Sequence, residues 1–358
     1  MRISSHPSFW LSSAAAAALL AGCSGGGAQF PAANAPLTPL RQSVRIIGLN
    51  HDPSMSILPR SAWLPNVPLT QRKGFVNVAG VNALHGNQTI ISEIAFNTVS
   101  VYGRNGQLNA ILSTGLSEPQ GLATDAAENL YVANTLKNNV LVYPKPYRSA
   151  RLTLSDANQY PAGVAVSQTG IVGVTNNQSV SGGSGSVSFY AKGSTVPCVT
   201  VSDPNWSRFY FAAFDASGTL YVDGQNSTGH TLVGDVSGGC GATSITTLTV
   251  GNTIQFPGGV QVQSGNILID DQMVPAIYTY GPPSGGSLGS PIATTLLTSG
   301  TDPVTFAMMK DGLSFWAASN GAQAGGFKYT YPGGLLTKSI TDGFLIAIGV
   351  AVNPAAAP

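Results

Sequence analysis

The stretch that decides the fold is Glu118–Thr153, which reads EPQGLATDAAENLYVANTLKNNVLVYPKPYRSARLT. It divides into four short apolar runs separated by polar turns: Gly121–Thr124, Asn129–Ala133, Val140–Tyr143 and Ala150–Leu154. Short runs bounded by Gly, Asn, Asp and Pro are typical of β-strands. Runs without a clean alternation of apolar and polar residues indicate strands that are covered on both faces. The stretch therefore predicts a four-stranded sheet stacked between similar sheets.

Degraded copies of this stretch follow it along the chain. With Gly121 as the anchor position, equivalent residues recur at a spacing that falls in the range of β-propeller blades. The anchors are Gly121, Gly163, Phe211, Gly259, Thr305 and Gly349. An apolar residue follows each anchor and a small residue, usually alanine, comes next, with Gln261 as the exception. This pattern is typical of a strand that lies close to an axis on which blades converge.

The first and last copies are each incomplete. Gly349–Asn353 supplies one strand and ends, whereas the range 87–114 lacks that strand and supplies the other three. If the two partial copies pair, no sheet edge is left unpaired. We therefore expect an all-β protein: a six-bladed β-propeller of four-stranded blades over residues 81–358, with the first blade closed by the C-terminal strand.

The second copy also resembles a known repeat. Pro119–Asn134, PQGLATDAAENLYVAN, is similar to the NHL-type pattern P-x-G-h-A-h-D-x-x-G-N-h-Y-V-A-N, although Glu128 stands where the pattern has glycine. The resemblance extends from about Asn87 to Pro354 and is sharpest in this copy. It implies an NHL-like propeller whose function resides in its loops rather than in its fold.

The N-terminal region resembles a bacterial lipoprotein signal. Arg2, an apolar run and Leu20-Ala21-Gly22-Cys23 match a signal peptide over 1–23 that ends in a lipid-modified Cys23, and a plain secretory peptide is the alternative. Ser24 resembles the sorting signal of outer-membrane lipoproteins. Residues 24–80 are then a flexible tether and lead-in segment. We expect a lipid-anchored protein of the cell envelope, with the membrane as a partner.

The charge and the cysteine content of the chain indicate which partners and which compartment it suits. Only 9% of residues are charged and the net charge is +1, so the chain lacks the clustered Lys and Arg that nucleic acids require. Beyond Cys23, the chain has Cys198 and Cys240 at related places in consecutive copies. In an oxidising compartment they would form a disulfide, and two free thiols are the alternative.

The loops that precede the first strand of each blade and those between its second and third strands emerge on one face, the loop-rich face. Aromatic and amide residues gather in these loops, together with one arginine. They are Tyr160, Trp206, Arg208, Tyr210, Phe256, Asn134, Asn176 and Asn226. Rings cover apolar sugar faces and amides both donate and accept hydrogen bonds, so the set favours a glycan ligand. The alternative is that the amides form turns and the aromatic residues fill gaps between blades.

Carboxylates form a second candidate set at the ends of second strands. Asp223, Asp270 and Asp271 are candidate Ca²⁺ ligands, with Glu93 at the matching place in the first blade. The alternative is that an acid at this position orders the loop that follows it. Apart from this possible Ca²⁺, no cofactor is expected.

An enzymatic function is suggested only by the resemblance in architecture to two classes of propeller enzyme. Lactonase-like propellers hold a divalent metal on the axis with carboxylate and asparagine side chains, whereas the inner strands here offer mainly alanines and aliphatic residues. Streptogramin-lyase-like propellers depend on histidine, but here only His85 and His230 lie in the domain. The sequence favours a binding or scaffold propeller that recognises a glycan or an envelope protein. A hydrolase or lyase with a site at the channel mouth is the alternative.

Overall fold

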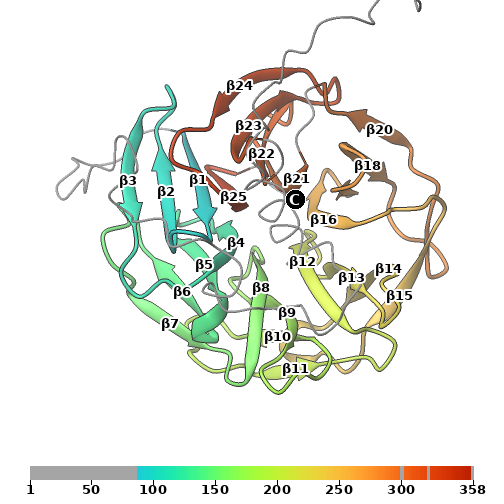
Figure 1. Cartoon of the computed structure of the whole chain (residues 1–358). Helices are drawn as coiled ribbons and strands as arrows, with labels where there is room; N and C mark the ends of the chain where they lie inside the picture. The colour runs from blue at the N-terminus through green and yellow to red at the C-terminus, as the bar shows by residue number, and fades with distance from the viewer. Residues whose placement is uncertain (1–86, 299–301, 321–322, 356–358) are drawn as a thin grey trace, which may run out of the picture. The chain divides into compact units, whose positions relative to one another are not determined.

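The computed structural model describes residues 87–298, 302–320 and 323–355, which form six β-sheets arranged as blades around an axis (Figure 1). The predicted signal peptide, Cys23, the predicted tether and His85 lie outside the described residues. Among the residues that are described, no helix has the length and apolar character needed to cross a membrane.

Each blade contains four antiparallel strands with its first strand innermost. Blade one comprises β25 (Ala347–Asn353), β1 (Gln88–Glu93), β2 (Thr98–Tyr102) and β3 (Leu108–Leu112), and blade two comprises β4 (Pro119–Thr124), β5 (Leu130–Asn134), β6 (Asn139–Tyr143) and β7 (Leu152–Ser155). Blade three comprises β8 (Gln159–Val166), β9 (Val172–Ser179), β10 (Ser186–Tyr190) and β11 (Val199–Val201), and blade four comprises β12 (Arg208–Phe214), β13 (Leu220–Gln225), β14 (Thr231–Val236) and β15 (Thr246–Val250). Blade five comprises β16 (Pro257–Gln263), β17 (Asn266–Asp271), β18 (Ala276–Tyr280) and β20 (Ala293–Leu296), and blade six comprises β21 (Pro303–Met308), β22 (Ser314–Ser319), β23 (Gly325–Thr330) and β24 (Leu336–Ile340). In the described part of the chain, two short 3-10 helices, η3 (Thr135–Lys137) and η4 (Gly239–Gly241), lie in loops.

The ring closes as the sequence predicts. β25 pairs with β1 in an antiparallel register that places Ile90 opposite Ala351 and Ile91 opposite Val350. The predicted six-bladed all-β propeller, with blade one completed by the C-terminal strand, is therefore confirmed.

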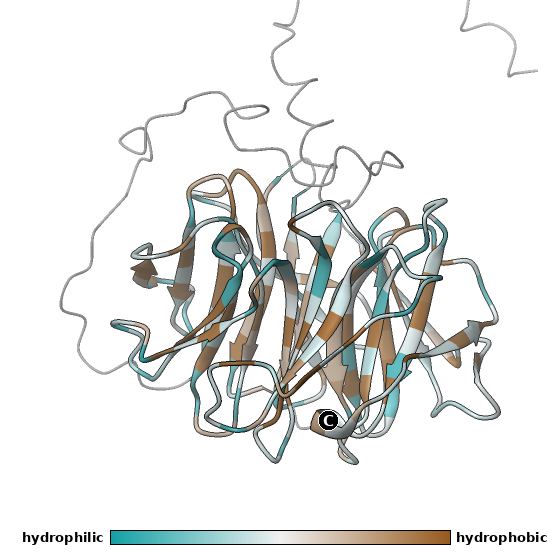
Figure 2. Ribbon diagram, turned by 90° about the horizontal axis from the view of Figure 1, so that it is seen from below, coloured by the Kyte–Doolittle hydropathy of each residue, from teal (hydrophilic) through white to brown (hydrophobic). Residues whose placement is uncertain are grey.

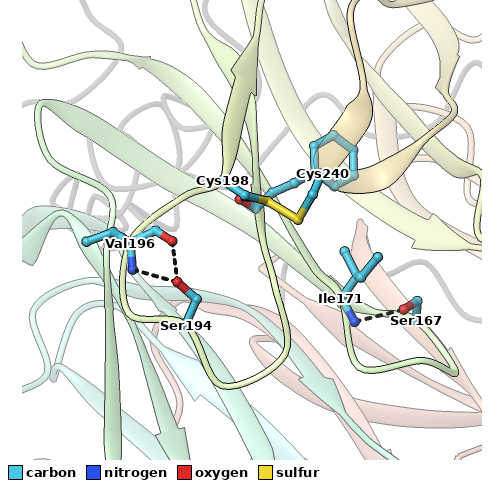
Figure 3. The surroundings of a disulfide bond; sticks show 7 residues. Ser167, Ile171, Ser194, Val196, Cys198 and Cys240 are labelled. Atoms are coloured by element: carbon cyan, nitrogen blue, oxygen red, sulfur yellow. Dashed lines mark hydrogen bonds between the residues drawn. A yellow bond between two sulfur atoms is a disulfide. The ribbon is translucent and has the colours of Figure 1, made fainter.

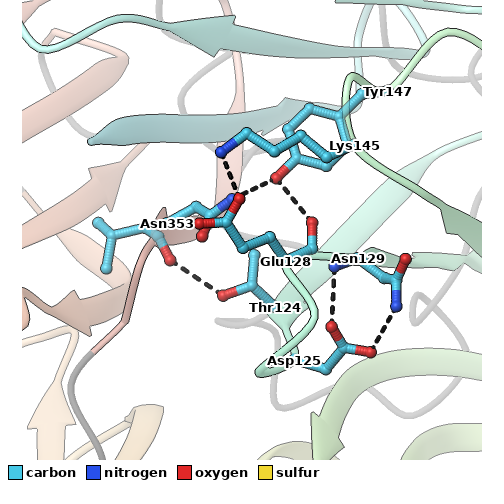
Figure 4. A network of polar contacts seen from close by, with 8 residues as sticks. Thr124, Asp125, Glu128, Asn129, Lys145, Tyr147 and Asn353 are labelled. Carbon is cyan, nitrogen blue, oxygen red and sulfur yellow. Dashed lines mark hydrogen bonds and ion pairs between the residues drawn. The ribbon is translucent and has the colours of Figure 1, made fainter. Parts of the chain in front are cut away.

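A polar network also ties the last strand to blade two (Figure 4). The Thr124 hydroxyl donates to the Val352 carbonyl oxygen at 2.9 Å, and the Asn353 side-chain amide donates to the Tyr147 hydroxyl at 2.6 Å. The Tyr147 hydroxyl in turn donates to the carbonyl oxygen of Glu128 at 3.0 Å. β25 is therefore held by its own sheet and by the neighbouring blade.

Close approach of the inner strands explains the anchor glycines. A Cβ on Gly121 would lie 2.6 Å from the Ala162 carbonyl oxygen, and one on Gly349 would lie 2.1 Å from the Gln120 carbonyl oxygen. Such distances are too short for any side chain. Glycine recurs at the anchor because main chains of adjacent blades meet there.

One difference from the predicted plan lies at the rim. The connection between β18 and β20 contains β19 (Ser287–Gly289), which pairs in parallel with β15 and gives blade four a fifth strand. A segment from blade five thus covers the outer edge of blade four, which protects that edge from pairing with another chain.

Apolar side chains fill the spaces between adjacent sheets. Figure 2 shows hydrophobic residues concentrated along the strands, with hydrophilic residues in many of the connecting loops. One such cluster joins blades three and four and includes Phe189, Trp206, Phe214 and Leu220. Because both faces of a blade are covered in this way, the strands have the nearly continuous apolar character seen in the sequence.

The turn between β4 and β5 contains the departure from the NHL-type pattern. Glu128 has φ 63°, a left-handed conformation. The equivalent turns place Gly170, Gly218 and Gly312 at φ 88°, 90° and 65°. Glu128 therefore occupies a position whose backbone favours glycine, and its carboxylate forms an ion pair with Lys145.

Replacing Glu128 with glycine is expected to raise the free energy of unfolding by roughly 0.5 kcal/mol, since a non-glycine residue in this conformation costs about 1 kcal/mol and a partly exposed ion pair contributes less. Glu128→Ala, which loses the ion pair but keeps the strain, is the matched control and is expected to be slightly destabilising. Urea unfolding of the three proteins tests this. The explanation fails if the glycine variant is no more stable than the alanine variant.

Candidate functional site

The inner strands of all six blades surround an axial channel of about 140 Å³. Alanines, valines and phenylalanines form most of its wall, and the described lining residues include no ionisable side chain. Gln261 is the one amide among them and is partly exposed to the channel. An apolar wall of this kind offers no group for proton transfer.

A smaller cavity lies at the mouth of the channel on the loop-rich face. Its described lining includes three residues with amide side chains, Gln120, Gln272 and Asn320, and the aromatic residues Tyr210 and Phe256. The Gln272 Nε2 already donates to the Pro257 carbonyl oxygen at 2.8 Å, which leaves its Oε1 as the acceptor at this position. The volume of the cavity is about 10 Å³, which accommodates roughly one water-sized group. Phe211 lines both this cavity and the channel.

Trp206 does not form the exposed platform expected from the sequence. It is 0% exposed, and its ring stacks on Phe209 at a centroid distance of 4.6 Å. Its indole N–H donates to the Thr247 hydroxyl at 2.9 Å. The residue belongs to the apolar cluster between blades three and four, as in the alternative interpretation.

Arg208, Tyr210 and Phe256 are also buried rather than displayed. The Tyr210 hydroxyl donates to Gln225 Oε1 at 2.7 Å, and its ring lies 5.6 Å from that of Phe256. Burial raises the pKa of Tyr210 to about 12, partly offset by Arg208. Tyr210 and Phe256 nevertheless border the mouth cavity, so their predicted position at the site is retained while their predicted exposure is wrong.

The asparagines that the sequence suggested as ligand contacts differ in exposure. Asn134 and Asn176 are buried: Asn134 Oδ1 accepts the Ser117 N–H at 2.6 Å, and Asn176 Nδ2 donates to two serine hydroxyls of β10. Both therefore order loops or strands and are not available to a ligand. Tyr160 and Asn226 are partly exposed, and the Asn226 side chain orders its own turn by accepting the His230 N–H.

Asp271 and Glu93, at the ends of second strands, each accept several main-chain N–H groups. Asp271 accepts the N–H groups of Gln255, Phe256, Met273 and Val274. Glu93 accepts those of Ala95, Leu345 and Ile346 in the same way. These acids order the adjoining loops, which was the alternative to a Ca²⁺ site.

Asp223 and Asp270 are fully buried on neighbouring blades. Within the described ranges, no group of three or more His, Cys, Asp or Glu side chains is placed to hold a metal ion. The structure therefore does not bring Asp223, Asp270 and Asp271 together as the ligand set that the sequence suggested.

Cys198 and Cys240 are joined by a disulfide with a Cα–Cα distance of 5.4 Å (Figure 3). Cys198 immediately precedes β11 of blade three, and Cys240 lies in η4 of blade four. The bond therefore links two consecutive blades at their outer strands.

Four residues that matter to the mouth were not selected from the sequence: Gln120, Gln272, Asn320 and Phe211. Phe211 had a visible signal, because it is the one aromatic residue in an anchor series dominated by glycine. The three amides had none, since nothing in their local sequence distinguishes them from ordinary loop residues.

No protein-family model matches this chain, and no curated protein matches it. Solved structures do. A nidogen/laminin complex aligns at TM-score 0.60 with 12% identity, covering 76% of this chain and 100% of the other. A protein of unknown function from Bacteroides caccae aligns at 0.57 with 8% identity, covering 75% and 99%. Virginiamycin B lyase from Staphylococcus aureus aligns at 0.51 with 13% identity, covering 72% and 81%. At these identities the likeness extends to the fold, and the chain is a six-bladed β-propeller.

Proposed function

We propose that this protein is a binding propeller of the cell envelope that takes a neutral, hydroxyl-bearing ligand, such as the end of a glycan, at the mouth of its channel. The observation that carries the proposal is the mouth cavity, to which all six blades contribute and which combines amide and aromatic residues. Its described lining contains no Asp, Glu, Lys, Arg or His.

The chemistry of the mouth favours this ligand class. Amide groups both donate and accept hydrogen bonds, so they pair with hydroxyl groups without requiring a charge. Aromatic and aliphatic neighbours suit the apolar faces of a sugar ring. Because the cavity accommodates about one water-sized group, one ligand hydroxyl enters it and the rest of the ligand lies on the surrounding loops.

The proposed location rests on the N-terminal sequence and on the cysteines. The resemblance of 1–23 to a lipoprotein signal supports attachment through Cys23. The disulfide between Cys198 and Cys240 supports a location outside the cytoplasm, because disulfides persist in oxidising compartments. The tether 24–80 would then present the propeller away from the membrane.

Replacing Gln120 with alanine is expected to weaken glycan binding about fivefold, because one hydrogen bond to the ligand contributes on the order of 1 kcal/mol. A glycan array with the mature protein identifies the ligand, and calorimetry compares the variants. Gln263→Ala is the matched control, since Gln263 lies at the far end of its inner strand and its amide donates to the Gly312 carbonyl oxygen.

Two results would contradict this function. One is an array without any bound glycan together with an envelope protein recovered by pull-down, which would indicate a protein partner instead. The other is a bound glycan whose affinity is unchanged by Gln120→Ala, which would place the site elsewhere on the propeller.

A further inference from the structure

One position on the second strand of each blade faces the anchor of that blade. In blade three, the anchor Gly163 is followed by the apolar residue Val164, which pairs with Val174. The position in question is the next residue on the second strand, Thr175. The residues at this position, in blades one to six, are Ser92, Ala133, Thr175, Asp223, Asp270 and Ala318. Two are hydroxyl residues, two are aspartates and two are alanines.

The hydroxyl residues join adjacent blades beside the axis. Ser92 Oγ accepts the N–H of the anchor Gly349 at 2.7 Å and donates to the Gln120 carbonyl oxygen of blade two at 2.7 Å. Thr175 Oγ1 donates to the Tyr210 carbonyl oxygen of blade four at 2.7 Å. In both cases the acceptor is the residue just before the anchor of the next blade.

Asp223 accepts the N–H of its own anchor but is not seen to donate to the next blade. Its Oδ1 accepts the N–H of the anchor Phe211 at 2.8 Å, as Ser92 does for Gly349. Its Oδ2 has no hydrogen-bond partner, although the side chain is 0% exposed. The equivalent acceptor in the next blade is the carbonyl oxygen of Gly258, the residue before the anchor Gly259.

Asp270 repeats the arrangement one blade further. It is fully buried, and neither carboxyl oxygen makes a hydrogen bond of good geometry, although the N–H of the anchor Gly259 lies close enough to interact with the carboxyl. A Cβ built on Gly258 would lie 1.6 Å from Asp270 Oδ1 and 2.9 Å from the Val304 carbonyl oxygen, so these two oxygens are neighbours. Val304 is the residue before the anchor Thr305. A buried carboxylate next to a carbonyl oxygen is repulsive, whereas a protonated carboxyl can donate to it.

The surroundings do not supply a compensating cation. The described charged or titratable residues on the two strands that bear the pair, and on the strands packed against them, are Arg208, Tyr210, Tyr221, Asp235, Asp271, Tyr278 and Tyr280. Arg208 is the one cation in this set and acts on the Tyr210 hydroxyl. The pKa of neither aspartate is lowered by it.

Burial raises the pKa of Asp223 well above its usual value, opposed by the Phe211 N–H. Burial also raises the pKa of Asp270, and the charges of Asp223 and Asp271 raise it further, partly opposed by the N–H of the anchor Gly259. Both effects favour the neutral carboxylic acid.

We propose that Asp223 and Asp270 are neutral carboxylic acids in the folded protein and donate hydrogen bonds to the carbonyl oxygens of Gly258 and Val304. They thereby join blade four to blade five and blade five to blade six, as hydroxyl groups join blades one and two and blades three and four. The propeller contains two proton-binding joints beside its axis.

The consequence for stability has a definite sign. An unfolded aspartate loses its proton near pH ~4, whereas each folded carboxyl keeps its proton to a higher pH. Above about pH 4 the folded state therefore binds more protons than the unfolded state, and its stability falls as pH rises towards the folded pKa. In this window each carboxyl makes the unfolding equilibrium constant rise about tenfold per pH unit, and below it the full stabilisation is present.

The test compares the wild-type protein with a double variant, Asp223→Thr and Asp270→Thr, which copies the blade-three arrangement at both sites. Urea unfolding from pH 4 to 9 should show that the unfolding constant of the wild type rises steeply with pH, while that of the variant rises much less. Asp156, whose pKa burial raises to about 6, is present in both proteins and cancels in the comparison. Asp342→Thr is the matched surface control and should follow the wild type.

Parallel pH curves for the wild type and the double variant would overturn the proposal. If the double variant does not fold, infrared spectroscopy of the wild type decides: a protonated-carboxyl C=O band that persists at neutral pH, and weakens in Asp223→Asn, supports the proposal, and its absence overturns it. A rise in the melting temperature with Ca²⁺ at pH 7 that EDTA reverses and the double variant loses would show ionised carboxylates that hold a cation, and would also overturn it.

Discussion

Replacing both Cys198 and Cys240 with serine is expected to lower the free energy of unfolding by about 4 kcal/mol. The bond spans a sequence separation of 42 residues, and the entropy that a crosslink of this length removes from the unfolded chain corresponds to that value. For a domain of this size the melting temperature should fall by roughly 10 °C. Calorimetry of the two proteins under non-reducing conditions measures the difference.

A reductant provides the internal control for this experiment. Dithiothreitol should lower the melting temperature of the wild type towards that of the serine variant and leave the variant unchanged. Mass analysis that finds two free thiols in protein from an oxidising compartment would contradict the disulfide. An unchanged melting temperature in the serine variant would instead show that the blades constrain one another without it.

Replacing Glu93 with alanine is expected to destabilise the protein by about 4 kcal/mol, because the N–H groups of Ala95, Leu345 and Ile346 lose their acceptor in a buried place. Leu345 and Ile346 directly precede β25, the strand that completes blade one. Urea unfolding gives the loss of stability, and hydrogen exchange of β25 shows where it arises.

Asp271→Ala is the matched comparison, since Asp271 accepts four N–H groups in blade five but has no part in closing the ring. Both variants should be less stable than the wild type. Only Glu93→Ala should speed hydrogen exchange across β25. Equal exchange of β25 in the two variants would show that Glu93 does not hold the closing strand in place.

The architecture was predictable because its constraints fall on single residues at fixed spacing. Adjacent inner strands meet at the anchor, which requires glycine in four of the six copies, and the incomplete first and last copies leave one way to pair. The NHL-type resemblance remains a prediction at the level of the repeat. β19 was not predicted, since Ser287–Gly289 lies in a stretch rich in Gly, Ser and Pro without a strand pattern.

The site was harder to predict because the same residue types serve the loops and the core. Trp206 precedes an inner strand, as an exposed ligand-binding ring would, yet it stacks on Phe209 between two sheets. Asn134 and Asp271 have the chemistry of ligand contacts but bind main-chain amides. Local sequence does not determine which side of a loop a side chain occupies, and the packing of neighbouring blades decides it.

The junction of β25 with β1 has a consequence for biosynthesis. A ribosome delivers β1 before the other five blades and β25 after them, so the first sheet waits for its inner strand until those blades have been made. A nonsense codon at position 347, the first residue of β25, would therefore leave β1 with an unpaired, apolar edge. Such a truncated product should aggregate or be degraded, even though five complete sheets precede the stop.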